Sequence, residues 1–292
     1  MSEYPLRLIL SPNDKPVISH SEAETFTLCE RKHYYSFGEK ISRTKKPDAL
    51  TRGQLGHKLM QAFFTNYRDT HDFDVAFEEM VKKSAELFTA DNAKNLVYLL
   101  QTIQGFFNHH RQRIERWTVV HVEETFRLEL QDFIYAFTPD IIVEENGQLV
   151  VVDWKFVYDF YDQEFIDMAP QIPRYVGALR ALGIHVSHGW YAFLRYRNIK
   201  EDGEGNRFKL QECKPNGARV QNSFKDLILS VKPISLQKEL NLIQWKDNSR
   251  RTADQKICSK MCDFKQLCSA ELNGSDGILI RQMSYEKSDY GY

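Results

Sequence analysis

The sequence predicts an α/β fold in which a helical N-terminal part packs against a mixed β-sheet. Apolar residues recur at helical spacing before residue 117, and short β-rich runs take over from residue 118 onward. The chain has 292 residues, of which 42% are hydrophobic and 27% are charged. That composition is typical of an ordinary globular protein, and the length allows a sizeable core.

The N-terminal part is expected to contain three or four helices. Ser19 or Ser21 is a suitable N-cap for a helix over about residues 22–38, and a second helix is expected over about 50–67. Residues 73–116 have the apolar spacing of one or two further helices. We therefore expect a helical part over residues 19–117, followed by a sheet core over residues 118–213.

The clearest signal in the sheet core is the dipeptide Asn146-Gly147, which lies between two β-rich runs. This dipeptide favours a two-residue turn between antiparallel strands. A two-residue turn also fixes the pairing register, which here begins with Glu145 opposite Gln148. The sequence therefore predicts a β-hairpin whose register can be followed residue by residue along both strands.

The predicted register places Asp140 opposite Asp153 and Thr138 opposite Lys155. Because alternate strand residues share a face, Asp140, Asp153 and Lys155 are expected to project from one side. Opposed carboxylates repel unless a cation lies between them, and Mg²⁺ prefers such oxygen ligands. A lysine beside that cation could orient the attacking water and stabilise charge on a phosphorane, which is what phosphodiester hydrolysis requires.

An Asp-x-Lys triplet has a simpler interpretation, because most such triplets lie on a solvated strand face. The flanking apolar residues 149–152 and Phe156 instead indicate a strand that is buried on at least one face. Charged side chains on a buried strand need partners. This observation favours the catalytic interpretation of Asp153 and Lys155, unless a bulge breaks the register.

The C-terminal half continues the alternation of helices and strands. A helix is expected over about residues 162–182, and strands are expected over 186–197 and 207–213. Residues 214–272 are expected to contain helices, one of them over 223–246 and interrupted at Pro233. The polar residues 273–292 are predicted to be a flexible tail. We expect residues 1–272 to form a single domain.

The cysteines indicate metal ligation rather than disulfides, which are uncommon in cytosolic proteins. Three of the five cysteines lie within a short C-terminal segment, and the full set is Cys29, Cys213, Cys258, Cys262 and Cys268. Both Zn²⁺ and a [4Fe–4S] cluster bind four thiolates, so the cysteine spacing alone does not decide between them. Cys213 has no evident partner and is expected to be a small buried apolar residue.

Short motifs in these segments resemble those of a known family. Pro139-Asp140, followed after twelve residues by Asp153-Trp154-Lys155, resembles the signature of the PD-(D/E)XK nucleases. The resemblance extends to their RecB-like branch through a Gly-x-x-x-His motif and a Gln-x-x-x-Tyr motif, which here are Gly53 to His57 and Gln171 to Tyr175. It implies a restriction-endonuclease-like fold, a mixed β-sheet core flanked by helices.

The resemblance also implies roles for individual residues. It makes His57, Asp140 and Asp153 metal ligands and Lys155 the catalytic lysine, while Gln171 and Tyr175 position DNA or brace the site. Glu123 or Glu124 is a candidate for a further acidic member. Taken alone, His57 would be interpreted as a core histidine that is hydrogen-bonded to a backbone carbonyl. Gln171 and Tyr175 alone would be interpreted as part of an ordinary helix face. Pro173 within that motif is compatible with a helix that begins near Pro170.

The cysteine pattern resembles the iron–sulfur subgroup of this family, which includes CRISPR-associated exonucleases and AddB-like nucleases. Cys29 matches the cysteine of an N-terminal helix, and Cys258, Cys262 and Cys268 match the C-terminal three. Glu30 stands where the subgroup usually has proline. The resemblance implies a structural [4Fe–4S] cluster that ties residue 29 to residues 258–268, with structural Zn²⁺ as the alternative.

Together these observations predict a Mg²⁺- or Mn²⁺-dependent DNA exonuclease that acts in recombination, replication or DNA processing. The expected partners are DNA, as single strands or duplex ends, and recombination or replication proteins. Two alternatives remain open. The first alternative is a non-catalytic DNA-binding or assembly module on a nuclease-like core. The second is an endonuclease of the same fold.

Charge and hydropathy add little to this prediction. The net charge of −1 gives no nucleic-acid signal on its own, so the prediction of DNA binding depends on the site. The N-terminus lacks a basic segment followed by an apolar run, and no stretch approaches the roughly 18 apolar residues of a membrane span. We expect a cytoplasmic protein of a prokaryotic cell or a virus-infected host.

Overall fold

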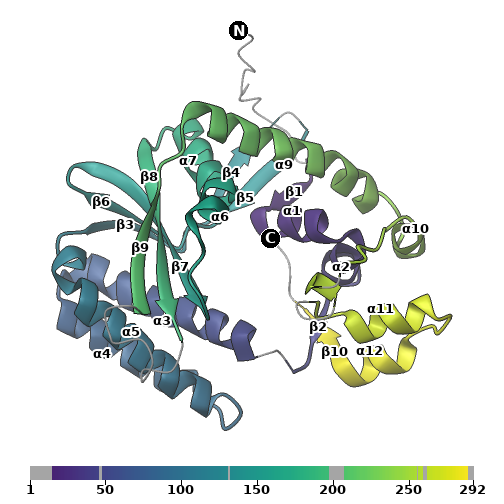
Figure 1. Ribbon diagram of the computed structural model, residues 1–292, viewed down its shortest axis with the longest axis horizontal. Helices are drawn as coiled ribbons and strands as arrows, with labels where there is room; N and C mark the ends of the chain where they lie inside the picture. Colours follow the sequence, from purple (N-terminus) through teal and green to yellow (C-terminus); the bar gives the residue numbers. More distant parts are fainter. Residues whose placement is uncertain are drawn as a thin grey trace. The chain divides into compact units, whose positions relative to one another are not determined.

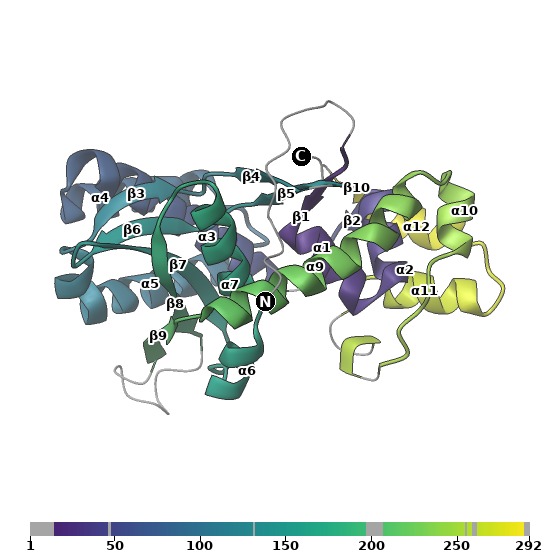
Figure 2. The ribbon, with the colours of Figure 1, turned by 90° about the horizontal axis from the view of Figure 1, so that it is seen from above.

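The computed structural model describes residues 15–45, 48–130, 132–196, 207–254, 256–258 and 262–288. The chain forms two compact units, each built from separate stretches (Figures 1 and 2). We call residues 47–126 and 137–223 the sheet unit, and residues 1–46, 127–136 and 224–292 the terminal unit. Where the sequence suggested one domain over residues 1–272, the N-terminal and C-terminal segments pack together as a unit of their own.

The sheet unit contains a five-stranded mixed sheet in the order β3-β6-β7-β8-β9. Strands β7 and β8 are parallel, and the other neighbours are antiparallel. The strands are β3 (Thr118–Val122), β6 (Ile141–Glu145), β7 (Gln148–Val157), β8 (Val186–Arg195) and β9 (Phe208–Cys213). This arrangement confirms the predicted α/β fold with a mixed sheet.

The predicted hairpin joins β6 and β7. Asn146 and Gly147 have φ angles of 52° and 74°, as a tight turn between twisted antiparallel strands requires. The pairing runs from Glu145 opposite Gln148 to Ile141 opposite Val152, in the register predicted from the sequence. The ladder ends at Ile141, so Asp140 lies immediately before the strand.

Helices cover both faces of the sheet (Figure 1). On one face lie α3 (Asp48–Thr70), α4 (Phe73–Glu86) and α5 (Ala93–Ile114). Buried Trp154 of β7 stacks on Phe64 of α3 and meets Phe106 of α5 edge to face. The opposite face of β8 packs against α7 (Gln171–Ala181), where a Cβ on Gly189 would overlap the Ile172 side chain. Alternate residues of β7 and β8 therefore face different helices.

The single helix expected over residues 162–182 is two helices, α6 (Gln163–Met168) and α7. Ala169 has extended backbone angles, as the position before Pro170 favours, and this ends α6. Pro173 lies in the first turn of α7, where its missing N–H leaves no intrahelical bond unmade. Helix α7 therefore begins next to Pro170, as the sequence predicted.

The terminal unit brings both ends of the chain together. Its N-terminal elements are β1 (Val17–Ser19), α1 (His20–Leu28), α2 (Glu30–His33), the π-helical turn η1 (Tyr34–Gly38) and β2 (Ile41–Arg43). Strands β4 (Phe126–Glu129) and β5 (Ile134–Phe137) form a sheet with β1. The C-terminal elements are α9 (Gly217–Lys238), α10 (Leu242–Asp247), α11 (Lys265–Leu272), α12 (Ile278–Ser284) and β10 (Tyr285–Lys287). An apolar cluster with Tyr35, Trp245, Phe264 and Leu267 joins the two groups.

Two predictions for the C-terminal part were wrong. Helix α9 continues through Pro233, because a proline removes one backbone hydrogen bond and the rest of the helix persists. Residues 278–287 form α12 and β10 instead of a flexible tail. Strand β10 pairs antiparallel with β2, and the Tyr285 ring stacks on Phe264 at 5.4 Å. This pairing compensates for the polar composition of the segment.

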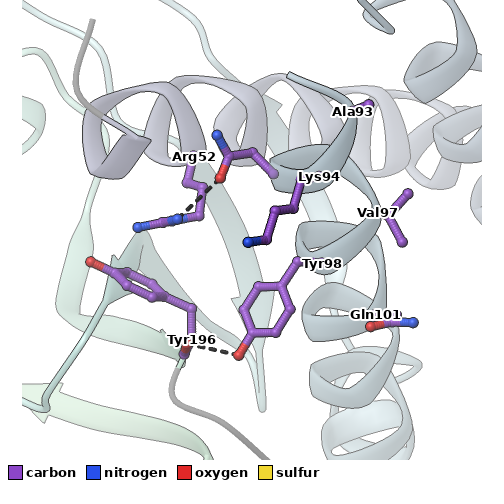
Figure 3. Close-up of a pocket in the computed structure, with 8 residues that line it drawn as sticks. Arg52, Ala93, Lys94, Val97, Tyr98, Gln101 and Tyr196 are labelled. Carbon is purple, nitrogen blue, oxygen red and sulfur yellow. Dashed lines mark hydrogen bonds between the residues drawn. The ribbon is translucent and has the colours of Figure 1, made fainter. Parts of the chain in front are cut away.

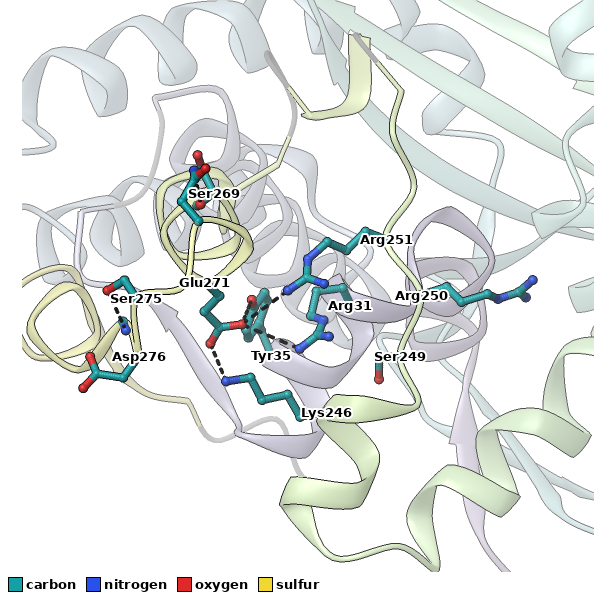
Figure 4. A network of polar contacts seen from close by, with 12 residues as sticks. Arg31, Tyr35, Lys246, Ser249, Arg250, Arg251, Ser269, Glu271, Ser275 and Asp276 are labelled. Carbon is teal, nitrogen blue, oxygen red and sulfur yellow. Dashed lines mark hydrogen bonds and ion pairs between the residues drawn. The ribbon is translucent and has the colours of Figure 1, made fainter.

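One carboxylate, Glu271, organises the polar contacts of the terminal unit (Figure 4). Its side chain is only 3% exposed, and it accepts a hydrogen bond from the Tyr35 hydroxyl at 2.8 Å. Four cations from separate segments surround it, at 2.6 Å for Arg281, 3.0 Å for Lys246, 3.6 Å for Arg31 and 3.8 Å for Arg251. Glu271 thus connects α2, α12 and the segment after α10.

In the part of the chain that the structure describes, none of the helices combines the length and the hydropathy needed to cross a lipid bilayer.

Candidate active site

Two buried carboxylates lie at the end of the β6–β7 hairpin. Asp153 projects from β7 on the face covered by α7, and its side chain is 3% exposed. The Asp140 side chain is 9% exposed, and its Oδ2 accepts a hydrogen bond from the Trp154 backbone N–H at 2.6 Å. The hairpin therefore brings Asp140 beside the Asp153-Trp154-Lys155 segment, as its register predicted.

The prediction for Thr138 was wrong. The ladder does not continue past Ile141, and the chain bends at Asp140, so Thr138 does not pair with Lys155. Its hydroxyl instead forms a 2.8 Å hydrogen bond with the Thr125 hydroxyl. The bend also aims the Asp140 carboxylate at the backbone of β7 rather than across a regular ladder.

His57 reaches these carboxylates from α3. Its Nδ1 lies 3.1 Å from Asp140 Oδ1 and 3.8 Å from Glu123 Oε1. The edge of its ring meets Phe156 of β7, with the ring centroids 5.8 Å apart. His57, Glu123 and Asp140 each offer one ligand atom, and these atoms all lie within 4.8 Å of one another. Among the described residues, this group has the donor set and spacing of a metal site.

Of the two glutamates that the sequence could not separate, Glu123 is the one that lies beside His57 and Asp140. Its backbone has φ 47°, a left-handed conformation that costs a non-glycine residue about 1–3 kcal/mol. The Glu123 N–H donates to the Asp140 carbonyl at 2.8 Å, which holds this turn directly after β3. Glu124 is exposed and pairs with His121 instead. No sequence motif encodes such a turn, so only the structure distinguishes the two glutamates.

Lys155 and Gln171 form a closed set of contacts with Asp153. The Lys155 ammonium lies 2.6 Å from Asp153 Oδ2 and donates to Gln171 Oε1 at 2.9 Å. The Gln171 amide donates to Asp153 Oδ1 at 2.7 Å and to the Tyr175 hydroxyl at 3.3 Å. The structure therefore brings together the four residues that the sequence placed on β7 and on the following helix.

The electrostatics of the site favour cations. Burial would lower the pKa of His57, but the Asp140 charge and hydrogen bonds with Asp140 and Glu123 outweigh it and raise that pKa to about 10. Burial raises the pKa of Asp153, and Asp140 raises it further against the opposing effect of Lys155. Burial would lower the pKa of Lys155, but the attraction of Asp153 prevails and raises it. The carboxylates thus create a local negative potential at His57 and Lys155.

The group that converges on one point differs from the predicted ligand set. The sequence assigned metal binding to His57, Asp140 and Asp153, whereas the converging group contains Glu123 in place of Asp153. Lys155 and Gln171 engage both oxygens of Asp153. Metal binding by Asp153 stays a prediction.

The position of His57 depends on close packing between α3 and β7. A Cβ on Gly56 would overlap the Phe156 ring, whereas a Cβ on Gly53 would meet open space. We expect Gly56→Ala to lower the free energy of unfolding by about 1–3 kcal/mol, the usual cost of overpacking. The matched variant Gly53→Ala should raise it by up to about 1 kcal/mol through helix propensity. Chemical denaturation measures both, and equal effects of the two variants would contradict this packing.

The four predicted cluster cysteines all lie in the terminal unit. Burial raises the pKa of the Cys262 thiol, and the charges of Cys29 and Cys268 raise it further against the opposing charge of Lys32. The Cys258 thiol donates to the Thr252 carbonyl at 2.9 Å. Among the described residues, no three or more cysteine sulfurs all lie within 4.8 Å of one another, so no cysteine cluster is evident.

Cys213 lies apart from this group. It is buried in β9 at 1% exposure, which confirms its prediction as a small core residue.

Comparisons with known proteins agree with this geometry. The sequence pattern of the PD-(D/E)XK nuclease superfamily matches residues 17–269. The chain is similar in structure to an exonuclease candidate from Eubacterium rectale, with a TM-score of 0.53 and 14% sequence identity. The match covers 87% of this chain and 88% of the Eubacterium rectale chain. It also matches the solved structure of SSO0001 with 12% identity, a TM-score of 0.36 and coverage of 89% of both chains. No curated protein matches the sequence.

Proposed function

The chain belongs to the PD-(D/E)XK nuclease superfamily, and we propose that it is a Mg²⁺- or Mn²⁺-dependent exonuclease that hydrolyses DNA. The observation that carries this proposal is the convergence of His57, Glu123 and Asp140 on one point, beside the ion pair of buried Asp153 and half-buried Lys155. Oxygen and imidazole donors with a lysine alongside match what metal-assisted phosphodiester hydrolysis requires. DNA is the substrate that the superfamily implies.

The residues fit a divalent cation. Glu123, Asp140 and His57 would hold it, and Asp153 is proposed as a further ligand. When bound, the cation would polarise the scissile phosphate and lower the pKa of an attacking water. The negative potential that raises the pKa of His57 is the potential that would favour such an ion.

Lys155 would contribute a fixed positive charge. Its ammonium is held between Asp153 and Gln171, so its position does not depend on substrate binding. A preorganised cation stabilises the negative charge that develops on the phosphoryl oxygens in the transition state. Gln171 positions both Lys155 and Asp153, and the Tyr175 hydroxyl braces the Gln171 amide in turn.

The proposal of an exonuclease is tested with linear and circular single-stranded DNA. Linear DNA should be degraded in Mg²⁺ or Mn²⁺, circular DNA should stay intact, and EDTA should stop the reaction. The description of the Eubacterium rectale protein as an exonuclease candidate supports this expectation. Cleavage of the circle would favour an endonuclease of the same fold. Failure of the folded protein to cleave either DNA with any metal would favour a non-catalytic binding module.

We also propose that Cys29, Cys258, Cys262 and Cys268 hold a [4Fe–4S] cluster. In support, Cys29 from the N-terminal part and the three C-terminal cysteines belong to the same compact unit. When bound, the cluster would link the start of α2 to α11 and the segment before it, and would stabilise the unit. Anaerobically purified protein should contain iron and absorb visible light. Cys29→Ser should lose both, whereas Cys213→Ser should keep them. Stoichiometric zinc without iron would overturn the cluster.

A further inference from the structure

The sheet unit has a pocket that contains none of the active-site residues. Its volume is about 660 Å³, within the usual range for ligand sites. The start of α3, the first turns of α5 and the end of β8 form its wall (Figure 3). The lining residues are Arg52, Ala93, Lys94, Asn95, Val97, Tyr98, Gln101 and Tyr196. We call this the Arg52 pocket.

Two cations give the Arg52 pocket its charge. The Arg52 guanidinium lies 4.3 Å over the Tyr196 ring, and its Nη1 donates to Asn95 Oδ1 at 3.0 Å. The Asn95 amide donates in turn to Asp48 at 3.2 Å, so a neutral group separates this nearby acid from Arg52. Within the described ranges, neither Arg52 nor Lys94 has a carboxylate ion-pair partner. The pocket therefore brings two positively charged side chains together.

Two tyrosines give the pocket aromatic surface and rigidity. The Tyr98 hydroxyl donates to the Tyr196 carbonyl at 2.7 Å and so connects α5 to the end of β8. In Figure 3 the Lys94 ammonium points into the space beside the Tyr98 ring, on the side where Arg52 and Tyr196 lie. Cations combined with aromatic rings are what proteins use to bind unpaired nucleotides, because the cations contact phosphates and bases stack on the rings.

The Arg52 pocket lies within reach of a strand bound at the active site. Arg52 precedes His57 by five residues of α3, which is about 7.5 Å along the helix axis. Tyr196 follows the last residue of β8, and Phe193 of that strand pairs with Lys155 of β7. Three residues of strand span about 10 Å. These separations suit a neighbouring nucleotide rather than the scissile phosphate itself.

We propose that the Arg52 pocket binds one unpaired nucleotide of a single-stranded DNA substrate, outside the scissile position. Arg52 and Lys94 bind its phosphate, and its base packs against Tyr98 and Tyr196. A concave site of this volume accepts a nucleotide whose base is free, whereas the bases of a duplex are already stacked and paired. This inference rests on the proposed function for the identity of the substrate, but its test does not require cleavage.

The test measures binding of a fluorescein-labelled oligothymidine by anisotropy in EDTA, over a series of salt concentrations. The double variant Arg52→Gln/Lys94→Gln is compared with Lys82→Gln/Lys83→Gln, which removes the same charge from exposed positions of α4. The pocket variant should bind roughly tenfold more weakly for each charged hydrogen bond to phosphate that it can no longer make. The slope of log K against log salt should become shallower by about 1.4, since each ion pair with a single-strand phosphate contributes about 0.7.

Lys94→Gln alone keeps the test valid if the double variant misfolds, because Lys94 is exposed and its loss should lower the slope by about 0.7. Affinities and slopes equal to those of the α4 variant would overturn the proposal. On a blunt hairpin duplex, the two variants should differ much less in affinity. An equal loss of affinity on the duplex would contradict the proposal that the pocket binds an unpaired nucleotide. If binding depends on the pocket but the protein cleaves no DNA, only the proposed function is contradicted. If the protein cleaves DNA but the pocket variant binds it as well as the α4 variant does, only the proposal for the Arg52 pocket is contradicted.

Discussion

Asp153→Asn is expected to reduce the rate of DNA cleavage by roughly 10³-fold, the upper range for losing one electrostatic group that acts in a transition state. The side chain is 3% exposed, and its two oxygens bind Lys155 at 2.6 Å and Gln171 at 2.7 Å. The amide preserves the shape but removes the charge that both the cation and Lys155 need. Initial rates on end-labelled DNA at saturating Mg²⁺ or Mn²⁺ measure the effect.

The matched control is Asp74→Asn, the same change at an exposed position of α4 whose side chain is 79% exposed. It should keep the wild-type rate. Lys155→Met should lose cleavage as Asp153→Asn does, because it removes the preorganised charge and keeps the apolar stem. Circular dichroism confirms that each variant is folded. Substantial activity in a folded Asp153 or Lys155 variant would show that the chemistry occurs elsewhere.

Glu271→Gln is expected to lower the free energy of unfolding of the terminal unit by about 3–5 kcal/mol, the usual cost of removing one partner from a buried ion pair. Glu271 is 3% exposed, and the amide would remove the counter-charge of Lys246, whereas Arg281 would keep only its pair with Glu39. Urea denaturation followed by tryptophan fluorescence measures the loss, since Trp245 lies in the apolar cluster of this unit.

The stability difference should also depend on pH. Burial would raise the pKa of Glu271, but hydrogen bonds from Arg281, Lys246 and Tyr35 prevail and lower it. Because the folded pKa lies below the ordinary value of 4.5, the contribution is complete above pH 4.5 and is lost as the pH falls through the folded pKa. Glu24→Gln, at a side chain that is 50% exposed and lies 3.0 Å from His20, should cost at most about 1 kcal/mol. Equal losses from both variants would contradict the organising role of Glu271.

The hairpin shows how much of the site local sequence can predict. Asn146-Gly147 specifies a turn of fixed length, and a fixed turn sets the register of both strands. The observed pairing from Glu145 to Ile141 follows that register. Asp140, Asp153 and Lys155 could therefore be brought together from sequence alone, and the motifs around His57 and Gln171 supplied the rest.

The parts that could not be predicted depend on backbone conformation or on distant contacts. Glu123 enters the site through a left-handed residue after β3, which neither propensity nor periodicity encodes. The bend at Asp140 ends the ladder one residue early and moves Thr138 away from Lys155. Residues 285–287 are ordered through pairing with β2, more than 240 residues earlier in the chain. Tertiary contacts of this kind override local composition.

The most direct test of the central claim is the cleavage of end-labelled single-stranded DNA by the wild-type protein, with Mg²⁺ or Mn²⁺ against EDTA. The site formed by His57, Glu123, Asp140, Asp153 and Lys155 predicts rapid cleavage with either metal and none in EDTA. Equal cleavage in EDTA, or no cleavage by folded protein with either metal, would contradict the assignment of these residues as a metal-dependent nuclease centre.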